Sequence, residues 1–429
     1  MLLSEASRHW ELNCYYNPVS DFAGGNRRIT DMGKGTVGDG RHIMNDKGQE
    51  KIQGKKINGT FRILSVIGIL LVVAGHADFQ LFDLGGLFPY YSFHVAVFLF
   101  ISGYFYREEA EQGIGACVKR KVRRLLLPYF TWNLFYGLIA AALHGAGFSI
   151  GQRIGFRTLF LEPFLNGHQF GWNFPAWFVP ALFLIEVLNV FMRKVLGWLH
   201  LKKEWLILFL CLCAGMLTVW FAIGGHVWGN YKFPGRILFM MPCYQMGCFY
   251  KKCLEKYDTL PDGIYFAGLL AVQLILVFSC GGLAYSTVWC TGFANGPAVP
   301  YLTTVTGIAF WLRIARRLEP ALGKMPAVER IGGNTYAVMM HHILGFFMVK
   351  GVICGIAAAM PWFQDFDMAA FLNDIGYIYV PGGVEAFKWV YIAAGICVPL
   401  FIQRCTEGIS RWISKQTKEA LPTRQRKDI

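Results

Sequence analysis

Two histidines lie in the first two long apolar segments of this chain. His76 closes the apolar run 70–76, and His94 comes shortly before the run 98–104, which ends in Ser-Gly-Tyr. Ionisable side chains are costly inside a bilayer, so they are candidates for a functional site. A neutral imidazole accepts a proton near pH 7 and can therefore act as a general base on a hydroxyl. The alternative role is a hydrogen bond that holds two helices together.

The depth of both histidines can be estimated from the helical rise. His76 lies about 21 Å along its segment from Arg62, and His94 lies about 20 Å from Arg107. The two segments are consecutive and antiparallel, so both basic residues mark the same membrane face. We therefore predict that the two imidazoles lie at matched depth, facing a common cavity.

The composition predicts a membrane protein. The 429 residues are 55% hydrophobic and 16% charged, whereas soluble proteins contain about 25% charged residues. The apolar segments of this chain are mostly about 17–25 residues long, which is enough to cross the hydrocarbon core as a helix. A helix suits this environment because its backbone groups form hydrogen bonds within the segment. We predict an all-α polytopic bundle of about ten transmembrane helices, near residues 61–79, 87–106, 125–147, 174–192, 205–224, 234–250, 263–281, 298–314, 334–359 and 386–402.

The positive charge alternates between the loops. The net charge is +14, and most of the 41 lysines and arginines lie in the N-terminal tail, in every second loop and at the C-terminus. This asymmetry predicts a multi-pass protein of the cytoplasmic membrane with both termini in the cytoplasm. No nucleic-acid recognition motif accompanies the charge, so nucleic acid is not expected as a partner.

Three regions follow from the pattern. Residues 1–57 are polar, glycine-rich and basic, which predicts a disordered cytoplasmic tail without a signal peptide. Residues 58–404 form the membrane domain, and 405–429 form a basic cytoplasmic tail.

The cysteines and histidines lack metal-ligand spacing, so we expect no metal site and no bound cofactor. Cys280 and Cys290 flank a predicted outer loop, and the sequence does not decide whether they pair.

Further polar and aromatic residues in the segments are candidates for substrate binding. Arg236 opens the sixth segment and either binds an anion, such as a donor phosphate, or reaches toward the interface. Glu186 either orients a histidine or pairs with a cation. His341 and His342 lie near the cytoplasmic end of the ninth segment, and neighbouring helical positions diverge by about 100°, so one faces the bundle if the other faces outward. The alternative for either is an interfacial histidine without a functional role. Trp177 lies where an aromatic belt is expected.

Four stretches, taken in this order and spacing, resemble the acyltransferase 3 family of integral membrane O-acyltransferases, especially its fucose 4-O-acetylase-like branch. The resemblance covers residues 60–404. The stretches are Val72-Val73-Ala74-Gly75-His76; Phe93-His94-Val95-Ala96-Val97-Phe98-Leu99-Phe100-Ile101-Ser102-Gly103-Tyr104 with the basic run 119–124; Pro175-Ala176-Trp177-Phe178-Val179-Pro180; and Ile331-Gly332-Gly333-Asn334-Thr335-Tyr336 leading to His341.

The resemblance implies transfer of an acyl group, usually acetyl, from a cytoplasmic acyl-CoA to a hydroxyl of a cell-surface or secreted glycan. The essential histidine of the family falls on His76, and a second characteristic histidine falls on His94. The family's basic residue eleven positions before the first histidine is replaced here by Ser65, and Arg62 lies one helical turn further back. Arg62 thus joins the other binding candidates as a substitute donor contact.

Two other functions fit the same pattern. Ten helices with polar residues inside also suit a transporter or exporter of a glycan or lipid-linked intermediate, although the paired broken helices of inverted repeats are not evident. Because Ser65 replaces the basic residue of the family, the chain also fits an inactive relative that acts as an assembly partner in polysaccharide synthesis. Self-association into a homo-oligomer is compatible with each alternative.

Overall fold

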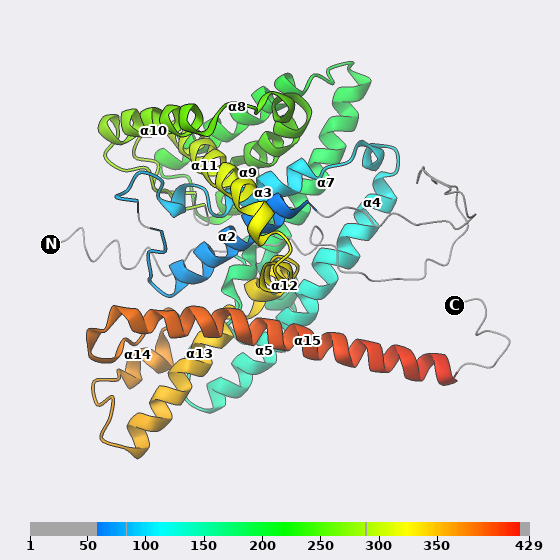
Figure 1. Ribbon diagram of the computed structural model, residues 1–429. Helices are drawn as coiled ribbons and strands as arrows, with labels where there is room; N and C mark the ends of the chain where they lie inside the picture. Colours follow the sequence, from blue (N-terminus) through cyan, green and yellow to red (C-terminus); the bar gives the residue numbers. More distant parts are fainter. Residues whose placement is uncertain (1–57, 83, 288–289, 421–429) are drawn as a thin grey trace, which may run out of the picture.

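The computed structural model describes residues 58–82, 84–287 and 290–420. These residues form helices joined by loops, with one isolated bridge between Ser286 and Thr291 (Figure 1). The all-α fold is therefore confirmed. The predicted tail 1–57 and residues 421–429 lie outside the described residues.

The longer helices are α2 (Gly59–His76), α5 (Leu127–Gly145), α7 (Phe178–Trp198), α8 (Glu204–Ile223), α9 (Lys232–Phe249), α10 (Asp262–Ser279), α11 (Val299–Leu322), α13 (Thr335–Ala359) and α15 (Lys388–Ala420). The shorter ones are α3 (Ala96–Tyr104), α4 (Ile114–Lys121), α6 (Glu162–Leu165), α12 (Pro326–Gly332) and α14 (Met368–Asn373).

Seven helical segments of the described chain are long and apolar enough to cross a membrane. They are Gly59–His76, Ile114–Gly145, Phe174–Trp198, Glu204–Ile223, Asp262–Ser279, Thr335–Ala359 and Glu385–Ser414. Ten spans are not confirmed, because the second, sixth and eighth predicted spans fall on α3, α9 and α11. Pro89 and the 3-10 turn Tyr90–Ser92 shorten the second to the nine residues of α3. Charged side chains make α9 and α11 less apolar than the lipid-facing α10.

Helix α2 is the central element of the bundle. It packs against α3, α11, α12, α13 and α15, and Leu64, Ile69 and Val72 on it are fully buried. By contrast, Ile275 and Phe278 on α10 are 65% and 86% exposed, as expected for a peripheral helix facing lipid. The C-terminal end of α2, which carries His76, is therefore surrounded by other helices.

Two glycines allow α3 and α9 to cross closely. A Cβ on Gly103 would lie 1.9 Å from the carbonyl oxygen of Tyr244, and one on Gly247 would lie 1.9 Å from that of Phe100. The backbones are thus in direct contact, and Cys248 Sγ donates a hydrogen bond to the Gly103 carbonyl at 3.2 Å. Small residues are the usual means of such close helix packing in membranes.

Helix α13 follows α2 in the same direction. A Cβ on Gly332, at the end of α12, would meet Arg62 Cγ at 2.6 Å and Val66 Cγ2 at 3.3 Å. His76 lies ten residues beyond Val66 on α2, and His342 lies seven residues after the start of α13 at Thr335. The two stretches therefore run side by side from the contact of Gly332 with Val66 to the contact of His342 with His76.

Helix α15 completes the group around the end of α2. The Nζ of Lys388, at its start, donates to the backbone oxygen of Asp78 at 2.7 Å. Further along, a Cβ on Gly395 would meet Val73 Cγ1 at 2.8 Å and His342 Cβ at 3.4 Å. Helices α13 and α15 pack against each other, and both contact α2.

Candidate active site

His76 and His342 form a hydrogen-bonded pair between the end of α2 and the second turn of α13. The Nδ1 of His76 lies 2.7 Å from the Nε2 of His342. The ring centroids are 4.8 Å apart with an interplanar angle of 22°. His342 is fully buried, whereas His76 is partly exposed. A partly exposed imidazole backed by a buried one is a geometry suited to proton transfer.

The backbone of α13 sets the protonation of this pair. The Nδ1 of His342 lies 2.9 Å from the carbonyl oxygens of both Val338 and Met339. Carbonyl oxygens only accept hydrogen bonds, so this nitrogen carries the proton and the Nε2 of neutral His342 is an acceptor. The Nδ1–H of His76 then donates to it, and the lone pair of neutral His76 resides on its Nε2.

His94 lies in a turn before α3 rather than within a helix. Its ring is buried, and its Nδ1 donates to the Tyr90 carbonyl at 2.6 Å. The rings of Tyr90 and Tyr91 lie 5.4 and 5.6 Å from it. Tyr90 also packs against Gly75, where a Cβ would lie 3.0 Å from its Cε2. His94 and the residue before His76 thus share Tyr90 as a neighbour, while the partner on Nδ1 of His76 is His342.

His342 is the residue at this site that the sequence reasoning did not select. That reasoning favoured His341 and counted the depth of both from the predicted cytoplasmic end of the ninth segment. His341 instead faces α5, with Nδ1 2.8 Å from the Tyr136 hydroxyl and the Trp132 ring centroid 4.2 Å away. The sequence did contain a signal for this difference. Adjacent residues of a helix point in different directions, so His341 and His342 must contact different neighbours.

An aromatic ring connects His76 to a second group of polar residues. Phe174, in the turn before α7, makes an edge contact with His76 at 5.1 Å between centroids and lies 6.0 Å from His168. The Nη2 of Arg236 donates to the Nε2 of His168 at 3.3 Å, and its guanidinium lies 4.7 Å from the Trp177 ring centroid. Two predicted binding residues, Arg236 and Trp177, are therefore stacked together near His76.

Arg62 lies at the opposite end of α2 from this group. Its Nη1 makes an ion pair of 2.8 Å with Glu329 on α12, whose side chain is 55% exposed. Ser65, at the position where the family has a basic residue, donates its hydroxyl to the Phe61 carbonyl at 2.8 Å. The positively charged side chain at this end of α2 is therefore Arg62, about one helical turn before the position of the family's basic residue.

Glu186 pairs with a cation, one of the two roles that the sequence left open. Its Oε1 accepts from the Nζ of Lys121 at 2.7 Å, which joins α7 to the end of α4. Nearby, Glu108 accepts a hydrogen bond from Lys252, and this contact lowers the pKa of the Glu108 carboxyl.

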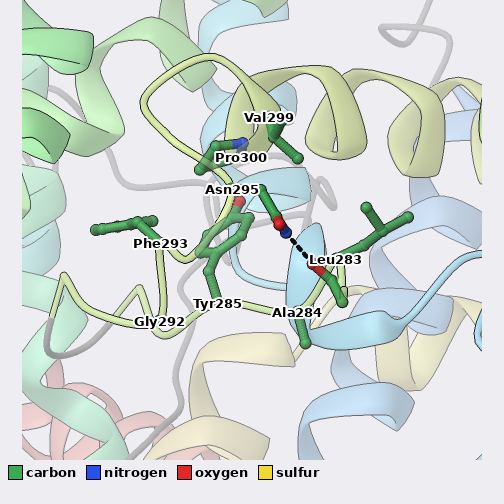
Figure 2. A pocket seen from close by; sticks show the side chains of 9 residues that line it. Leu283, Ala284, Tyr285, Gly292, Phe293, Asn295, Val299 and Pro300 are labelled. Carbon is green, nitrogen blue, oxygen red and sulfur yellow. Dashed lines mark hydrogen bonds between the residues drawn. The ribbon is translucent and has the colours of Figure 1, made fainter. Parts of the chain in front are cut away.

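The loop between α10 and α11 encloses a small hollow. Tyr285, Phe293, Asn295 and Pro300 contribute to its lining, and the Asn295 amide donates to the Gly282 carbonyl (Figure 2). Its volume of about 10 Å³ has room for one water molecule. Binding pockets for substrates are far larger, so this hollow is not a substrate site. In the same loop region, Cys280 and Cys290 are both free thiols.

Comparison with known families assigns most of the chain to one family. The model of the acyltransferase domain that defines the acyltransferase 3 family matches residues 61–366, which include α2, α3, α9 and the histidine pair. The chain belongs to the acyltransferase 3 family and is a membrane-embedded acyltransferase. No curated protein and no solved structure shows a significant match to the chain.

Proposed function

We propose that the protein transfers an acetyl or other short acyl group from a cytoplasmic acyl-CoA to a hydroxyl of a cell-surface or secreted glycan. The hydrogen bond of 2.7 Å between His76 and His342 is the observation that carries this proposal. It leaves the basic nitrogen of His76 directed away from His342, as a general base requires. Acyl-CoA and glycan are substrates, and no bound cofactor is involved.

In the proposed step, the Nε2 of His76 removes the proton of the acceptor hydroxyl. The hydroxyl oxygen attacks the thioester carbonyl, and a tetrahedral intermediate forms. Its C–S bond then breaks, and the departing thiolate takes the proton back from the His76 imidazolium. In a covalent variant, Nε2 itself attacks the carbonyl, and the C–S bond breaks to release the thiolate. The hydroxyl oxygen then attacks the acyl-imidazole, the C–N bond breaks to return the lone pair to Nε2, and the hydroxyl proton passes to the thiolate.

His94 is the second proposed catalytic residue. Its Nδ1 already donates to the Tyr90 carbonyl, so its neutral form offers an acceptor at Nε2. An acceptor suits a neighbouring hydroxyl of the sugar, because the reacting hydroxyl gives its only hydrogen to His76, whereas stabilising the oxyanion requires the protonated ring. We therefore infer that neutral His94 holds the acceptor and that any oxyanion contact follows its protonation.

The two substrates are proposed to approach from opposite ends of α2. Arg62, at its start, lies on the side where the sequence places the cytoplasmic positive charge, which attracts the phosphates of the donor. About 21 Å separates Arg62 from His76 along the helix. The extended thiol arm of an acyl-CoA spans such a distance, so the thioester reaches the imidazole while its phosphates remain at the basic face.

Mass spectrometry of surface glycans tests the proposal. We expect cells producing the wild-type chain to carry acetyl esters that are absent without the gene, and His76→Ala to reduce them by at least roughly 10²-fold. His226→Ala is the matched control, because His226 is an exposed histidine in the loop before α9. Equal acetylation in His76→Ala at equal protein abundance would exclude His76 from the mechanism.

A second measurement separates the enzyme from its alternatives. Purified protein in lipid nanodiscs is incubated with labelled acetyl-CoA and de-O-acetylated glycan from the same cells. Label in the glycan supports the acyltransferase. Movement of intact glycan across proteoliposomes without label transfer would instead identify a carrier, and neither activity would identify an assembly partner.

A further inference from the structure

Two cations are buried one turn apart on α9. Lys232 and Arg236 are 6% and 0% exposed, respectively. Residues four apart share one helix face, so their charges repel, and burial removes the water that would screen them. Such a pair within a membrane protein indicates a functional site rather than a packing element.

The loop before α7 holds both cations in place through neutral groups. The Lys232 ammonium donates to the Asn166 side-chain oxygen, and Arg236 Nη1 donates to the Asn166 carbonyl at 3.0 Å. Gly167, the next residue, adopts a φ of +80°, and a Cβ there would lie 2.6 Å from the Cβ of Trp177. The loop can follow this path only with glycine at that position.

His168 contributes a neutral imidazole to the cluster. Burial lowers its pKa well below the ordinary value, and the charges of Arg236 and Lys232 lower it further. The side chain is thus unprotonated at neutral pH and accepts from Arg236. Burial and the charge of Arg236 lower the pKa of Lys232 to about 7, and the carboxylate of Glu162, which pairs with Arg157 at 3.2 Å, opposes this shift. These four charged residues together carry a net positive charge.

The position of the cluster points to the acceptor rather than the donor. Through His168 and Phe174 it adjoins His76, at the end of α2 that lies opposite Arg62. The donor phosphates are expected near Arg62, about 21 Å from the imidazole. With the donor phosphates expected near Arg62, we assign the anion expected at Arg236 to the acceptor.

We propose that Lys232 and Arg236, held by Asn166 and His168, bind an oxyanion of the acceptor, so that the enzyme selects a glycan with a carboxylate or phosphate close to the acylated hydroxyl. The planar guanidinium provides paired donors for such a group, and the ammonium provides a second positive charge. This inference rests on the proposed function and names its substrate class.

Mapping of the acetyl esters provides the first test. Tandem mass spectrometry locates each gene-dependent ester within the surface glycans. We expect the esters on sugars that carry a carboxylate or phosphate, or on their direct neighbours. Esters confined to neutral stretches would overturn this inference while leaving the proposed function intact, whereas the absence of any gene-dependent ester would refute the proposed function itself.

Chemical removal of each anion distinguishes its source. De-O-acetylated glycan from the same cells is used as acceptor after carboxyl reduction in one arm and after dephosphorylation in the other. We expect the arm that removes the recognised anion to lower kcat/KM for the acceptor roughly tenfold or more, with little change for the donor. Unchanged kcat/KM in both arms would refute an oxyanion subsite.

Substitutions assign the effect to the two cations. Lys232→Met and Arg236→Met should each lower kcat/KM for the native acceptor roughly tenfold and leave the KM of acetyl-CoA within about twofold, while Arg236→Lys retains part of the activity. Lys350→Met is the control, since Lys350 is another buried cation, bonded to the carbonyls of Ile375 and Tyr377. Loss of donor binding in the Arg236 variants, or an equal acceptor defect in Lys350→Met, would contradict the proposal.

Discussion

The orientation of His76 depends on a chain of hydrogen bonds that begins at the backbone. The carbonyls of Val338 and Met339 fix the proton of His342 on Nδ1, and its Nε2 then accepts the proton of His76. The direction of each hydrogen bond follows from its acceptor: a carbonyl oxygen for Nδ1 of His342, and the unprotonated Nε2 of His342 for Nδ1 of His76. In the proposed mechanism, His342 takes the orienting role that a carboxylate has in other catalytic groups.

Substitution of His342 tests this chain. His342→Leu removes the acceptor for His76 Nδ1, so we expect acyl transfer to fall by roughly 10²–10⁴-fold, as when the orienting residue of a triad is lost. His342→Gln keeps an oxygen that can accept the same hydrogen bond and should retain more activity than His342→Leu. The measurement is kcat with labelled acetyl-CoA and de-O-acetylated glycan.

Nitrogen NMR of labelled histidine provides a readout that a purely structural role would not change. Wild-type His76 should show its proton on Nδ1, and His342→Leu should show a mixture of tautomers. Membrane abundance and thermal stability of each variant serve as controls. Full activity of His342→Leu in a folded protein would rule out the orienting role.

Sequence reasoning identified His76 and His94 because they are ionisable residues within apolar segments. It also placed Arg236 and Trp177 among the binding residues, but it could not show that they stack. His342 was not selected because its depth was counted from the membrane surface. That count placed His342 near the cytoplasmic end of the ninth segment, whereas the structure pairs it with His76, at the end of α2 opposite Arg62.

Among the helices, the bounds of two long ones were predicted closely. The predicted segments 234–250 and 334–359 agree with α9 and α13 to within about two residues. The segment 87–106 was wrong for its first half, because Pro89 and the following turn prevent a helix before Ala96. Apolar composition alone does not reveal where the backbone leaves the helix.

The crossing of α3 and α9 explains the glycine in the Ser102-Gly103 motif. A methyl group on Gly103 would overlap the Tyr244 carbonyl, so Gly103→Ala must push the two helices apart. We expect a loss of about 1–3 kcal/mol in the free energy of unfolding, as is typical of overpacked cores. Thermal unfolding of the purified protein in detergent measures this change.

Gly268→Ala is the matched control for that substitution. Gly268 lies within α10, and a Cβ there would meet no atom within 4 Å. Alanine favours the helix over glycine by about 1 kcal/mol, so this variant should be equally or more stable. Stability of Gly103→Ala equal to that of Gly268→Ala would contradict the close crossing.

For the whole molecule, the directions of α2 and α15 determine where the described ends of the chain lie. The start of α15 contacts the end of α2 through Lys388 and Asp78, and further along Gly395 packs against Val73. The two helices therefore run in opposite directions, so the start of α2 and the end of α15 lie on the same side of the bundle. The sequence predicts that this side is cytoplasmic, because most of the positive charge is there.

Reporter fusions test this orientation. A fluorescent protein fused after Ile429 should be bright and a phosphatase at the same position inactive, because the fluorescent protein folds in the cytoplasm and the phosphatase outside it. The same phosphatase inserted in the loop 360–367 should be active, since this loop follows the end of α13 on the His76 side. An active phosphatase after Ile429 would reverse the orientation. The donor would then have to approach from the His76 end, next to Lys232 and Arg236, and their assignment to the acceptor would fail with it.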